Sequence, residues 1–241
     1  MNACDAQRSP LDMPEAAKFQ ARQVADQLAV AFSHVHLLQA VEDLHWGTLT
    51  ALARAIDAKS PWTAGHSERV TKLAVRIGRQ MDLSSSDLRI MQMGGLLHDI
   101  GKIRTPQQIL DKPGPLTPEE LSVMRDHAQI GVRILEPIAG FHKALPVVAQ
   151  HHEWVNGHGY PERLAGEGIS IYARIYAVAD CYDALTSDRP YRKGLLRQKA
   201  VAMLQGESWG HFDPRVIEAF TLVAAENTEA AERAASAEAG S

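Results

Sequence analysis

The sequence predicts an all-α protein, a multi-helix bundle with a long N-terminal helix and a glycine-rich loop. Apolar residues recur at spacings of three and four along most of the 241 residues, and no segment shows the alternation with a period of two that is typical of a strand. Apolar residues make up 45% of the chain, enough for a substantial core. We expect a disordered N-terminus at 1–16, a helix or linker at 17–47, one main domain at 48–225 and a disordered tail at 226–241.

The N-terminal segment has a helical pattern from about Ala17 to Asp57. Apolar residues recur along it at spacings of three and four: Val24, Leu28, Ala31 and Val35. A helix this long ahead of a compact domain indicates a stalk or the seam of a homodimer. The alternative is one more helix that packs on the domain, since apolar stripes of this kind usually face a core.

The main domain contains further helical patterns separated by breaks. They cover approximately 63–81, 87–99, 118–136, 142–153, 170–186, 195–206 and 213–226. Thr117 and Glu120 have the spacing of a capping box, and Pro118 takes the first helical position, so we expect a helix to begin there. The proline-rich segment 104–118 and the glycine-rich segment 156–168 are expected to be loops.

The composition excludes several classes of protein. A formal charge of −4 argues against a protein that binds DNA or RNA by its net charge, although a local basic pocket stays open. Two cysteines without a CxxC motif argue against a disulfide framework. No apolar run approaches the roughly 18 residues of a membrane span, and the N-terminus has no signal-peptide pattern. We therefore expect a cytoplasmic protein without a membrane span.

Histidine is the unusual residue in this sequence. Eleven is a high number for this length, and most of them lie between residues 66 and 158. Seven histidine and aspartate residues lie in or beside helical patterns with apolar stripes: His66, His98, Asp99, His127, His151, His152 and Asp180. A single buried histidine is more often a core residue than a ligand. So many of these groups on buried faces need a shared partner, and a metal ion is the commonest one.

The ligand types narrow the choice of metal. Imidazole and carboxylate groups without a thiolate suit Fe, Mn, Co, Ni or Zn in an open site. Seven ligands exceed the needs of one ion but suit two ions that share a carboxylate, and ions about 3.5–4 Å apart are the usual device for phosphoester displacement. In GGLLHDIGK (94–102), His98 and Asp99 would face the metals, and Lys102, one turn on, would face a phosphate.

Several segments resemble the motifs of one known family. They are TAGHSERV, GLLHDIGK, ILDKPGPLTPEE, HHEWVNGHGYP (151–161), DCYDALTSDRPYRKG and HFDPRVIEAF, in this order. GLLHDIGK is similar to the signature of the HD phosphohydrolase superfamily, and HHEWVNGHGYP is similar to the element that defines its HD-GYP branch. The resemblance covers residues 48–222. It implies an all-α HD-domain bundle that hydrolyses the bacterial second messenger cyclic di-GMP to pGpG, with GMP as a further product.

The resemblance also implies roles for individual residues. One divalent ion would be bound by His66, His98, Asp99 and Asp180, and a second by His127, His151 and His152, with Asp99 bridging the two. A hydroxide between the ions would attack phosphorus, and Lys102 would stabilise the developing charge, so Asp99 and Lys102 are the candidate catalytic residues. Asp183 would lie near the metals and the substrate. Arg189 and Arg192 would hold the phosphates and guanine, which suits guanidinium groups, and the alternative for both is a solvated basic turn.

The chain departs from the family pattern at a few positions. Trp154 and Asn156 stand where many members have a basic residue and then an aspartate, and Arg163 replaces a common glycine. None of these changes removes a ligand. Trp62 stands where some members have a glutamate that helps to hold a third metal. We therefore expect two divalent ions, iron or manganese first, with nickel, cobalt or zinc as alternatives.

Two residues and the N-terminal segment have more than one interpretation. Cys181, next to Asp180, is expected to be a small core residue, with a ligating or oxidisable thiol as the alternative. Tyr160 has either a structural or a contact role, since the family's GYP loop is associated with docking of diguanylate cyclase (GGDEF) domains. The segment ARQVADQLAVAFSHVHLLQAV resembles the last helix of a GAF sensor domain, which makes 17–47 a candidate remnant of a sensor.

Three functions are compatible with these features. The preferred one is a two-metal cyclic di-GMP phosphodiesterase. The second is an HD hydrolase that acts on another cyclic dinucleotide or nucleotide. The third is a non-catalytic module that docks on diguanylate cyclase domains or forms a regulatory dimer, although a binding module would not need seven intact ligands.

Overall fold

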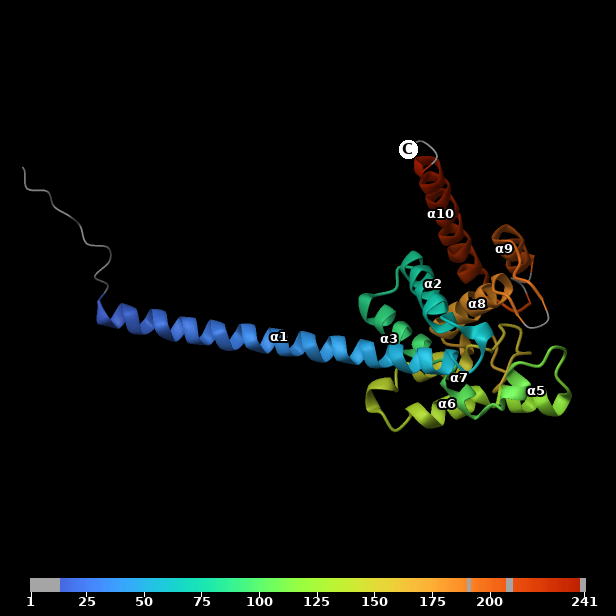
Figure 1. Cartoon of the computed structure of the whole chain (residues 1–241), viewed down its shortest axis with the longest axis horizontal. Coiled ribbons are helices and arrows are strands. Elements are labelled where there is room, and N and C mark those ends of the chain that lie inside the picture. Colours follow the sequence, from blue (N-terminus) through green and yellow to red (C-terminus); the bar gives the residue numbers. More distant parts are fainter. Residues whose placement is uncertain (1–13, 190–191, 207–209, 239–241) are drawn as a thin grey trace, which may run out of the picture. The chain divides into compact units, whose positions relative to one another are not determined.

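The computed structural model describes residues 14–189, 192–206 and 210–238, with side chains described as far as residue 226. Within these residues the regular elements are all helices, and the extended pairings are two isolated bridges, Asn156 with Ala165 and Arg189 with Arg192. The predicted all-α fold with a long N-terminal helix is therefore confirmed (Figure 1). Among the described helices, none combines the length and the apolar composition that a membrane span requires.

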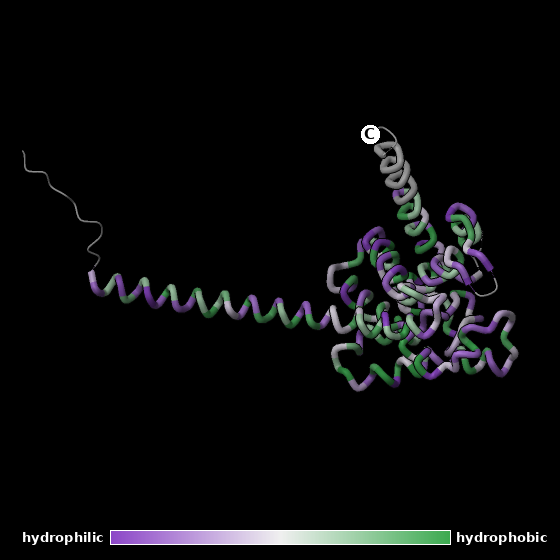
Figure 2. Tube along the Cα trace, viewed as in Figure 1, coloured by the Kyte–Doolittle hydropathy of each residue, from purple (hydrophilic) through white to green (hydrophobic). Residues whose placement is uncertain are grey.

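The chain divides into two units after Thr48. Helix α1 (Glu15–Asp57) supplies the described part of the first unit and the beginning of the second, while residues 1–13 of the expected disordered N-terminus lie outside the described residues. Figure 2 shows hydrophobic and hydrophilic residues alternating along α1. Its apolar stripe is exposed: Val24 54%, Leu28 53%, Val35 57% and Leu38 59%.

The second unit is built from short helices joined by tight turns. Its longer helices are α2 (His66–Gln80), α3 (Ser85–Leu96), α5 (Pro118–Arg125), α6 (His127–Leu135), α7 (Leu145–Gln150), α8 (Ile171–Thr186), α9 (Arg197–Gly206) and α10 (Pro214–Glu238). The shorter ones are α4 (Gln107–Leu110) and the 3-10 turns η1 (Pro61–Thr63), η2 (Ile100–Arg104), η3 (Ala139–Phe141) and η4 (Gly166–Gly168). Every helical pattern expected in the main domain lies on one or two of these helices.

The segment 118–136 forms two helices rather than one. The predicted capping box is present, and α5 begins at Pro118. The break falls at Asp126, where the ring of His127 donates through Nδ1 to the carbonyl oxygen of Met124 at 2.6 Å. A continuous helix would offer that carbonyl to the backbone N–H of Ala128. The position of a site histidine thus coincides with the end of the helix before it.

Two other segments differ from the expected loops and tails. Helix α4 forms one turn inside the proline-rich segment 104–118, directly after Pro106, a position at which proline is compatible with a helix start. Helix α10 continues to Glu238, through most of the segment expected to be a disordered tail. Residues 239–241 lie outside the described residues.

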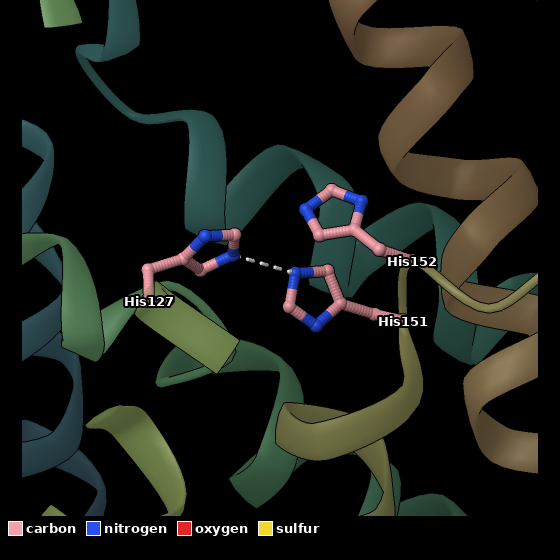
Figure 3. A group of neighbouring side chains, drawn as sticks. All are labelled: His127, His151 and His152. Carbon is pink, nitrogen blue, oxygen red and sulfur yellow. Dashed lines mark hydrogen bonds between the residues drawn. The ribbon is translucent and has the colours of Figure 1, made fainter. Parts of the chain in front are cut away.

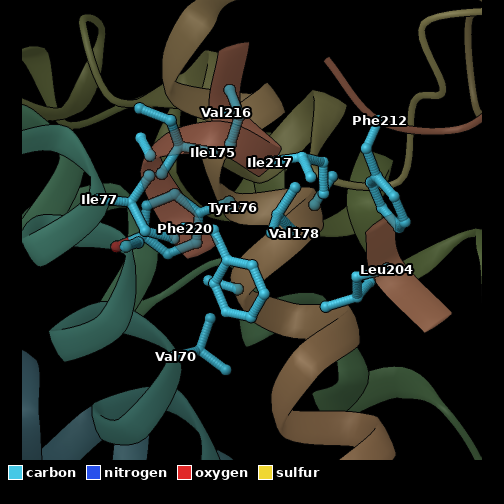
Figure 4. Packing of buried hydrophobic residues seen from close by; sticks show 14 of the residues in the cluster. Val70, Ile77, Ile175, Tyr176, Val178, Leu204, Phe212, Val216, Ile217 and Phe220 are labelled. Atoms are coloured by element: carbon cyan, nitrogen blue, oxygen red, sulfur yellow. The ribbon is translucent and has the colours of Figure 1, made fainter. Parts of the chain in front are cut away.

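Helix α8 contacts α2, α7, α9 and α10. Side chains from α2, α8, α9 and α10, together with Phe212 just before α10, form the core seen in Figure 4: Val70, Ile77, Ile175, Tyr176, Val178, Leu204, Phe212, Val216, Ile217 and Phe220. The hydroxyl of the fully buried Tyr176 donates to the carbonyl oxygen of Met91 at 3.0 Å, so its one polar atom is satisfied. Burying each large apolar side chain contributes about 1.5–3 kcal/mol, so this packing fixes α2 and α8, which both carry site residues.

Asp213 ties α10 to α8. Its carboxylate is 5% exposed, accepts from the backbone N–H of Arg215 at 2.9 Å in the first turn of α10, and pairs with the guanidinium of Arg174 at 2.6 Å. An aspartate before the first helical residue satisfies an otherwise unpaired N–H group.

Candidate metal centre

His66 is the first residue of α2, and its side chain is buried. The start of this helix is fixed by Asp57, whose carboxylate accepts from the backbone N–H (3.1 Å) and the hydroxyl (2.8 Å) of Ser67. A negative charge at this end of a helix also interacts favourably with the helix dipole. Together these contacts hold His66 at a defined position.

His98 and Asp99 lie in the turn between α3 and η2. This turn approaches α6 very closely at Gly101, where a Cβ would come 1.9 Å from the carbonyl oxygen of His127. Only glycine permits such an approach, which explains the glycine two residues after the HD pair. The contact brings Asp99 Oδ1 to 3.4 Å from His127 Nε2.

The other three histidines come from α6 and α7. His127 is the first residue of α6, while His151 and His152 follow the last turn of α7. Figure 3 shows the three rings gathered around one centre, with a dashed line between the Nε2 atoms of His127 and His151, which are 3.2 Å apart.

Helix α8 adds two aspartates that contact the same ring. Asp180 Oδ1 lies 3.3 Å from His66 Nε2, and Asp183 Oδ2 lies 2.8 Å from His66 Nδ1. The two carboxylates are three residues apart, so they share one face of the helix.

All seven predicted ligands come together in overlapping groups whose ligand atoms lie within 4.8 Å of one another. The groups are His127 with His151 and His152, His66 with His98 and Asp180, and His98 with Asp99 and His151. Asp99 joins them, because Oδ2 lies 3.6 Å from His66 Nε2 and 3.5 Å from His98 Nε2 while Oδ1 faces His127. One carboxylate thus directs its two oxygens at two groups of ligands, which is the arrangement that a bridging role requires.

The hydrogen bonds around the rings leave acceptor atoms pointing inward. Nδ1 donates to a backbone carbonyl in three of the histidines: His98 to Gly95 (2.7 Å), His127 to Met124 (2.6 Å) and His151 to Val148 (3.0 Å). A neutral imidazole carries one proton, so Nε2 of each of these rings is an acceptor. Within the described chain, the buried His98 Nε2 and Asp99 Oδ1 have no hydrogen-bond partner.

These residues fit a pair of divalent cations. Each buried acceptor without a partner costs about 1–3 kcal/mol, and two acceptor nitrogens 3.2 Å apart repel each other. Two cations, one beside His66, His98 and Asp180 and one beside His127, His151 and His152, would satisfy all of these atoms at once, with the backbone carbonyls orienting the rings. The fit rests on donor chemistry and position, and metal ligation by the individual residues stays a prediction.

Burial and local charge set the protonation states of the centre. Burial lowers the pKa of His127, His151 and His152, the last to about 3, so these rings are neutral. Burial also acts against ionisation of Asp99, but electrostatic interactions with Lys102 and the surrounding histidines together outweigh it, and the pKa of Asp99 lies well below its usual value. Neutral imidazoles and an ionised carboxylate are the forms that bind metals.

His66 behaves differently from the other histidines. Burial alone would lower its pKa, but hydrogen bonds to Asp180 and Asp183 outweigh burial and raise the pKa to about 9. In the metal-free chain the His66 ring is therefore protonated and positively charged, and it lies between the carboxylates of Asp180 and Asp183.

Asp183 lies behind His66 rather than in an open position. Its Oδ2 accepts from His66 Nδ1 (2.8 Å) and Arg69 Nη2 (3.0 Å), and its Oδ1 accepts from Arg69 Nε (2.7 Å). The residue is 7% exposed. A contact between Asp183 and substrate is expected from the sequence, whereas this geometry favours orientation of the His66 ring.

The three basic residues expected to bind substrate fall into two groups. Lys102 Nζ lies 2.5 Å from Asp99 Oδ2, and both Lys102 and Arg189 line a cavity of about 570 Å³. Arg192 does not line this cavity. Its guanidinium donates to the carbonyl oxygens of Leu185 (3.0 Å) and Ala184, at the end of α8. There it satisfies carbonyl groups that a helix end leaves unpaired.

Glu153, the residue after the two histidines, had no role in the sequence analysis. Its side chain is 1% exposed and accepts from the backbone N–H groups of Glu162 (2.6 Å), Arg163 (3.0 Å) and Leu164 (3.1 Å). One carboxylate thus holds the glycine-rich loop. One feature of the sequence could have indicated this role: Glu153 is a charged residue between a pair of site histidines and a loop whose backbone N–H groups need acceptors.

The glycine-rich loop packs against His152. The ring of Tyr160 stacks on that of His152, with centroids 4.6 Å apart, and the guanidinium of Arg125 lies 5.0 Å from the centroid of the Tyr160 ring. A Cβ on Gly159 would come 2.3 Å from the backbone nitrogen of Trp154, so glycine permits the approach. These contacts favour a structural role for Tyr160.

The departures from the family pattern lie outside the ligand groups. Arg163 has φ of 56°, in the left-handed region that favours glycine, which accounts for the common glycine at this position. The ring of Trp154 packs on His211, with centroids 3.9 Å apart. Asn156 accepts from the backbone N–H of His158 at 3.0 Å. Cys181 is half-buried and packs against the core.

Comparison with known proteins identifies the family. The model of the HD domain family matches residues 50–216, well over half of the chain. The cyclic di-GMP phosphodiesterase response regulator RpfG of Xanthomonas campestris is 41% identical over 181 residues, which are 74% of this chain and 48% of that protein. The cyclic di-GMP phosphodiesterase PA4108 of Pseudomonas aeruginosa is 42% identical over 179 residues, 73% of this chain and 42% of that protein.

A relative with a different name is almost as similar. The 3'3'-cGAMP-specific phosphodiesterase 3 of Vibrio cholerae is 40% identical over 166 residues, 69% of this chain and 36% of that protein. The chain therefore spans less than half of the length of each of these three relatives.

Solved structures share the fold. Bd1817, an HD-GYP-type protein from Bdellovibrio bacteriovorus, superposes with a TM-score of 0.57 at 20% identity and covers 68% of this chain and 52% of that one. The HD domain of the L. monocytogenes phosphodiesterase PgpH, in complex with cyclic-di-AMP, superposes with a TM-score of 0.53 at 21% identity and covers 74% of this chain and 96% of that one. At these identities the likeness concerns the fold alone. The family match and the relatives together show that the chain belongs to the HD domain family, in its HD-GYP branch.

Proposed function

We propose that this chain is a metal-dependent phosphodiesterase that hydrolyses cyclic di-GMP to linear pGpG, with GMP as a further product. The observation that carries the proposal is the position of Asp99, whose two oxygens face separate groups of histidines. Two curated relatives at about 40% identity are named for this substrate. The lining of the adjoining cavity includes the cationic side chains of Lys102 and Arg189, which suits an anionic ligand.

The ions that would complete the site are two divalent cations, with iron or manganese preferred over nickel, cobalt or zinc. His66, His98, Asp99 and Asp180 would hold one, and His127, His151 and His152 would hold the other together with Asp99. When bound, such a pair supplies a hydroxide nucleophile from water and draws negative charge from the phosphate oxygens.

The protein's own groups prepare this chemistry. Asp183 and the backbone carbonyls orient the imidazole rings, so the ligand atoms need little rearrangement when the site fills. Lys102 lies between Asp99 and the cavity, where its ammonium group would donate to a phosphate oxygen as charge develops there. Arg189 would hold a second phosphate oxygen from the cavity wall.

A second candidate substrate is 3'3'-cGAMP. The observation in its favour is the relative from Vibrio cholerae, which is 40% identical and named as specific for that dinucleotide. Cyclic di-GMP and 3'3'-cGAMP share the cyclic phosphodiester ring and differ in one base, so the same metal centre would serve both. Relatives of both names are about equally similar to this chain, and cyclic di-GMP is preferred because it is also the substrate implied by the GYP and DRPYR motifs.

Two partners belong to the same proposal. Homodimers would form through α1, whose apolar stripe is exposed, and diguanylate cyclase (GGDEF) domains would dock at the glycine-rich loop. A non-catalytic module that only docks remains the third hypothesis. The complete set of seven inward-facing groups argues against it.

The direct test is turnover by protein purified without oxygen and loaded with Fe(II) or Mn(II). Cyclic di-GMP, 3'3'-cGAMP and cyclic di-AMP would be compared by chromatography of the products, in parallel with metal analysis. We expect cyclic di-GMP to be cleaved fastest, with pGpG appearing first. Faster cleavage of 3'3'-cGAMP would establish the second candidate, and metal-loaded protein that cleaves none of the three would support the docking module instead.

A further inference from the structure

The cavity that borders the candidate metal centre is large and mostly apolar. Its volume of about 570 Å³ is within the range of small-molecule sites. Much of its wall consists of apolar side chains: Trp62, Ile109, Leu110, Pro115, Leu116 and Met124. Lys102 and Arg189 lie in the same wall, and Lys102 also contacts Asp99. The cavity therefore joins an apolar chamber to the cationic edge of the metal centre.

Trp62 gives this chamber a flat aromatic surface. It lies in the turn η1, and the residue is 37% exposed although it lines the cavity. An aromatic ring that lines a cavity without being buried has a face available to a planar ligand.

The turn that carries Trp62 is firmly braced. The backbone N–H of Trp62 is directed at the hydroxyl of Ser60 (3.3 Å), and that hydroxyl donates to Asp111 Oδ1 at 2.6 Å, directly after α4. Lys59 braces the neighbouring wall, because its ammonium group donates to the carbonyl oxygens of Lys102 (2.8 Å) and Thr105 (2.9 Å). The chamber is thus preformed, which lowers the entropic cost of binding a ligand.

Like Lys102, which contacts Asp99, the two other lysines in the wall are held by protein groups. Lys59 is held by backbone carbonyls, and Lys112 Nζ pairs with Glu120 Oε2 at 2.5 Å. The chamber consequently offers stacking and apolar contact more than donors aimed at the edge of a ligand.

We propose that this chamber binds one purine base of the dinucleotide, stacked on the indole of Trp62, while the adjoining phosphate reaches Lys102 and the metal centre. The identity of the ligand rests on the proposed function, but the base site itself follows from the chamber and its aromatic surface. Trp62 is then a substrate-binding residue at the position where some members of the branch have a metal-binding glutamate. Because stacking does not depend on the edge of the base, guanine and adenine are bound to a similar extent.

The test compares three variants of the full chain. Trp62→Leu removes the aromatic face but keeps an apolar side chain, Trp62→Phe keeps a smaller face, and Trp46→Leu is the matched control, since Trp46 does not line the cavity. With metal-loaded protein, we expect Trp62→Leu to raise KM for cyclic di-GMP and 3'3'-cGAMP roughly tenfold or more, with kcat and metal content nearly unchanged. Trp62→Phe should fall between wild type and Trp62→Leu, and the control should match wild type.

A binding measurement separates this inference from the proposed function. Isothermal titration of metal-free protein with cyclic di-GMP should show binding that Trp62→Leu weakens by a similar factor. Cleavage with unchanged KM and affinity in Trp62→Leu would overturn the base site and leave the proposed function standing. Binding that depends on Trp62 without any cleavage would support the base site and reject the proposed function, while absence of binding to metal-free wild type would overturn the base site.

Discussion

Asp99 directs its two carboxylate oxygens at different neighbours. Oδ2 faces His66, His98 and the ammonium group of Lys102, while Oδ1 faces His127 and is buried without a hydrogen-bond partner within the described chain. In this position Asp99 contacts residues of both the His66 group and the His127 group. Its removal should therefore affect both metal positions.

Asp99→Ala should lose both ions and lower activity by ~10³-fold or more, because a shared ligand cannot be replaced by the residues around it. Metal analysis of protein purified without oxygen, together with turnover of cyclic di-GMP, measures both effects. Asp26→Ala, the same change on the exposed surface of α1, is the control. Retention of two ions by the Asp99 variant would contradict the bridging role.

Lys102 has a different predicted phenotype, because it contacts Asp99, a predicted metal ligand, without being a predicted ligand itself. Lys102→Met should keep the metal content of wild type and lower kcat by roughly 10²–10³-fold, since a positioned cation stabilises charge that develops in the transition state. Steady-state kinetics with parallel metal analysis checks this, and Lys72→Met, an exposed lysine of α2, serves as the control. Loss of metal in the Lys102 variant would show that the residue acts through Asp99 instead.

Single elements of the structure are held by a few buried carboxylates. Glu153 holds the glycine-rich loop through three backbone N–H groups, and Asp57 fixes the start of α2. Asp213 joins α10 to α8. In each case an acidic side chain accepts hydrogen bonds that the helix or loop cannot provide for itself.

Glu153→Gln should loosen the glycine-rich loop. An amide has one acceptor oxygen and a donor group that cannot face backbone N–H groups, so at least one buried bond is lost and the free energy of unfolding should fall by about 2–4 kcal/mol. Because Tyr160 stacks on His152, the affinity for metal should fall as well. Chemical denaturation and limited proteolysis within 156–168 measure these effects, with Glu162→Gln as the exposed control in the same loop. Unchanged stability would show that other contacts hold the loop.

The pairing of Asp213 makes stability depend on pH. Burial works to raise its pKa, but hydrogen bonds and charge from Arg215 and Arg174 outweigh burial and lower the pKa below 3.8. Since the folded pKa lies below the unfolded one, the stabilisation is complete above about pH 5 and is lost as the pH falls through the folded pKa. Asp213→Asn should lower the free energy of unfolding by about 2–4 kcal/mol at pH 7.

The same comparison at low pH tests the origin of that effect. The difference in unfolding free energy between wild type and Asp213→Asn should stay constant from pH 8 to about pH 5 and shrink below that, as measured by urea denaturation. A difference that does not change with pH would mean that the carboxylate charge is not responsible.

At the scale of the whole molecule, the unexplained feature is the exposed apolar stripe of α1. Its residues at 24, 28, 31, 35 and 38 are spaced alternately by four and three, the repeat of a two-stranded coiled coil. The four with large apolar side chains are more than half exposed: Val24, Leu28, Val35 and Leu38. Such a stripe is most simply covered by the same helix of a second copy.

We expect the chain to sediment as a dimer at micromolar concentration, and Leu28→Glu to shift it to a monomer, because a charge at a seam position is buried without a partner. Analytical ultracentrifugation measures the mass, and Gln27→Glu, which adds the same charge beside the stripe, is the control. A wild-type chain that stays monomeric at tens of micromolar would reject this dimer.

The residues that form the site could be predicted from the sequence, whereas many of their contacts could not. Histidine and aspartate stand out on apolar helices, so His66, Asp99 and Asp180 could be selected before their contacts were known. The contacts of Asp183 and Arg192 could not be predicted, because an acidic or basic residue near the site is compatible with several roles, and only the structure shows that Asp183 contacts His66 and Arg69 while Arg192 contacts the end of α8. Glu153 was missed for the same reason, since its three partners are backbone groups, which every sequence contains.

By itself, the sequence determined most of the helices and the set of side chains that gather at the centre, because periodicity, capping residues and the choice of ligand types are local properties of the chain. The tertiary structure alone decided which atoms face one another: the division of Asp99 between two groups, the carbonyls that orient the rings, and the chamber beside Trp62. These depend on contacts such as that of His66 with Asp183, 117 residues apart, and packing of the whole domain sets such distances.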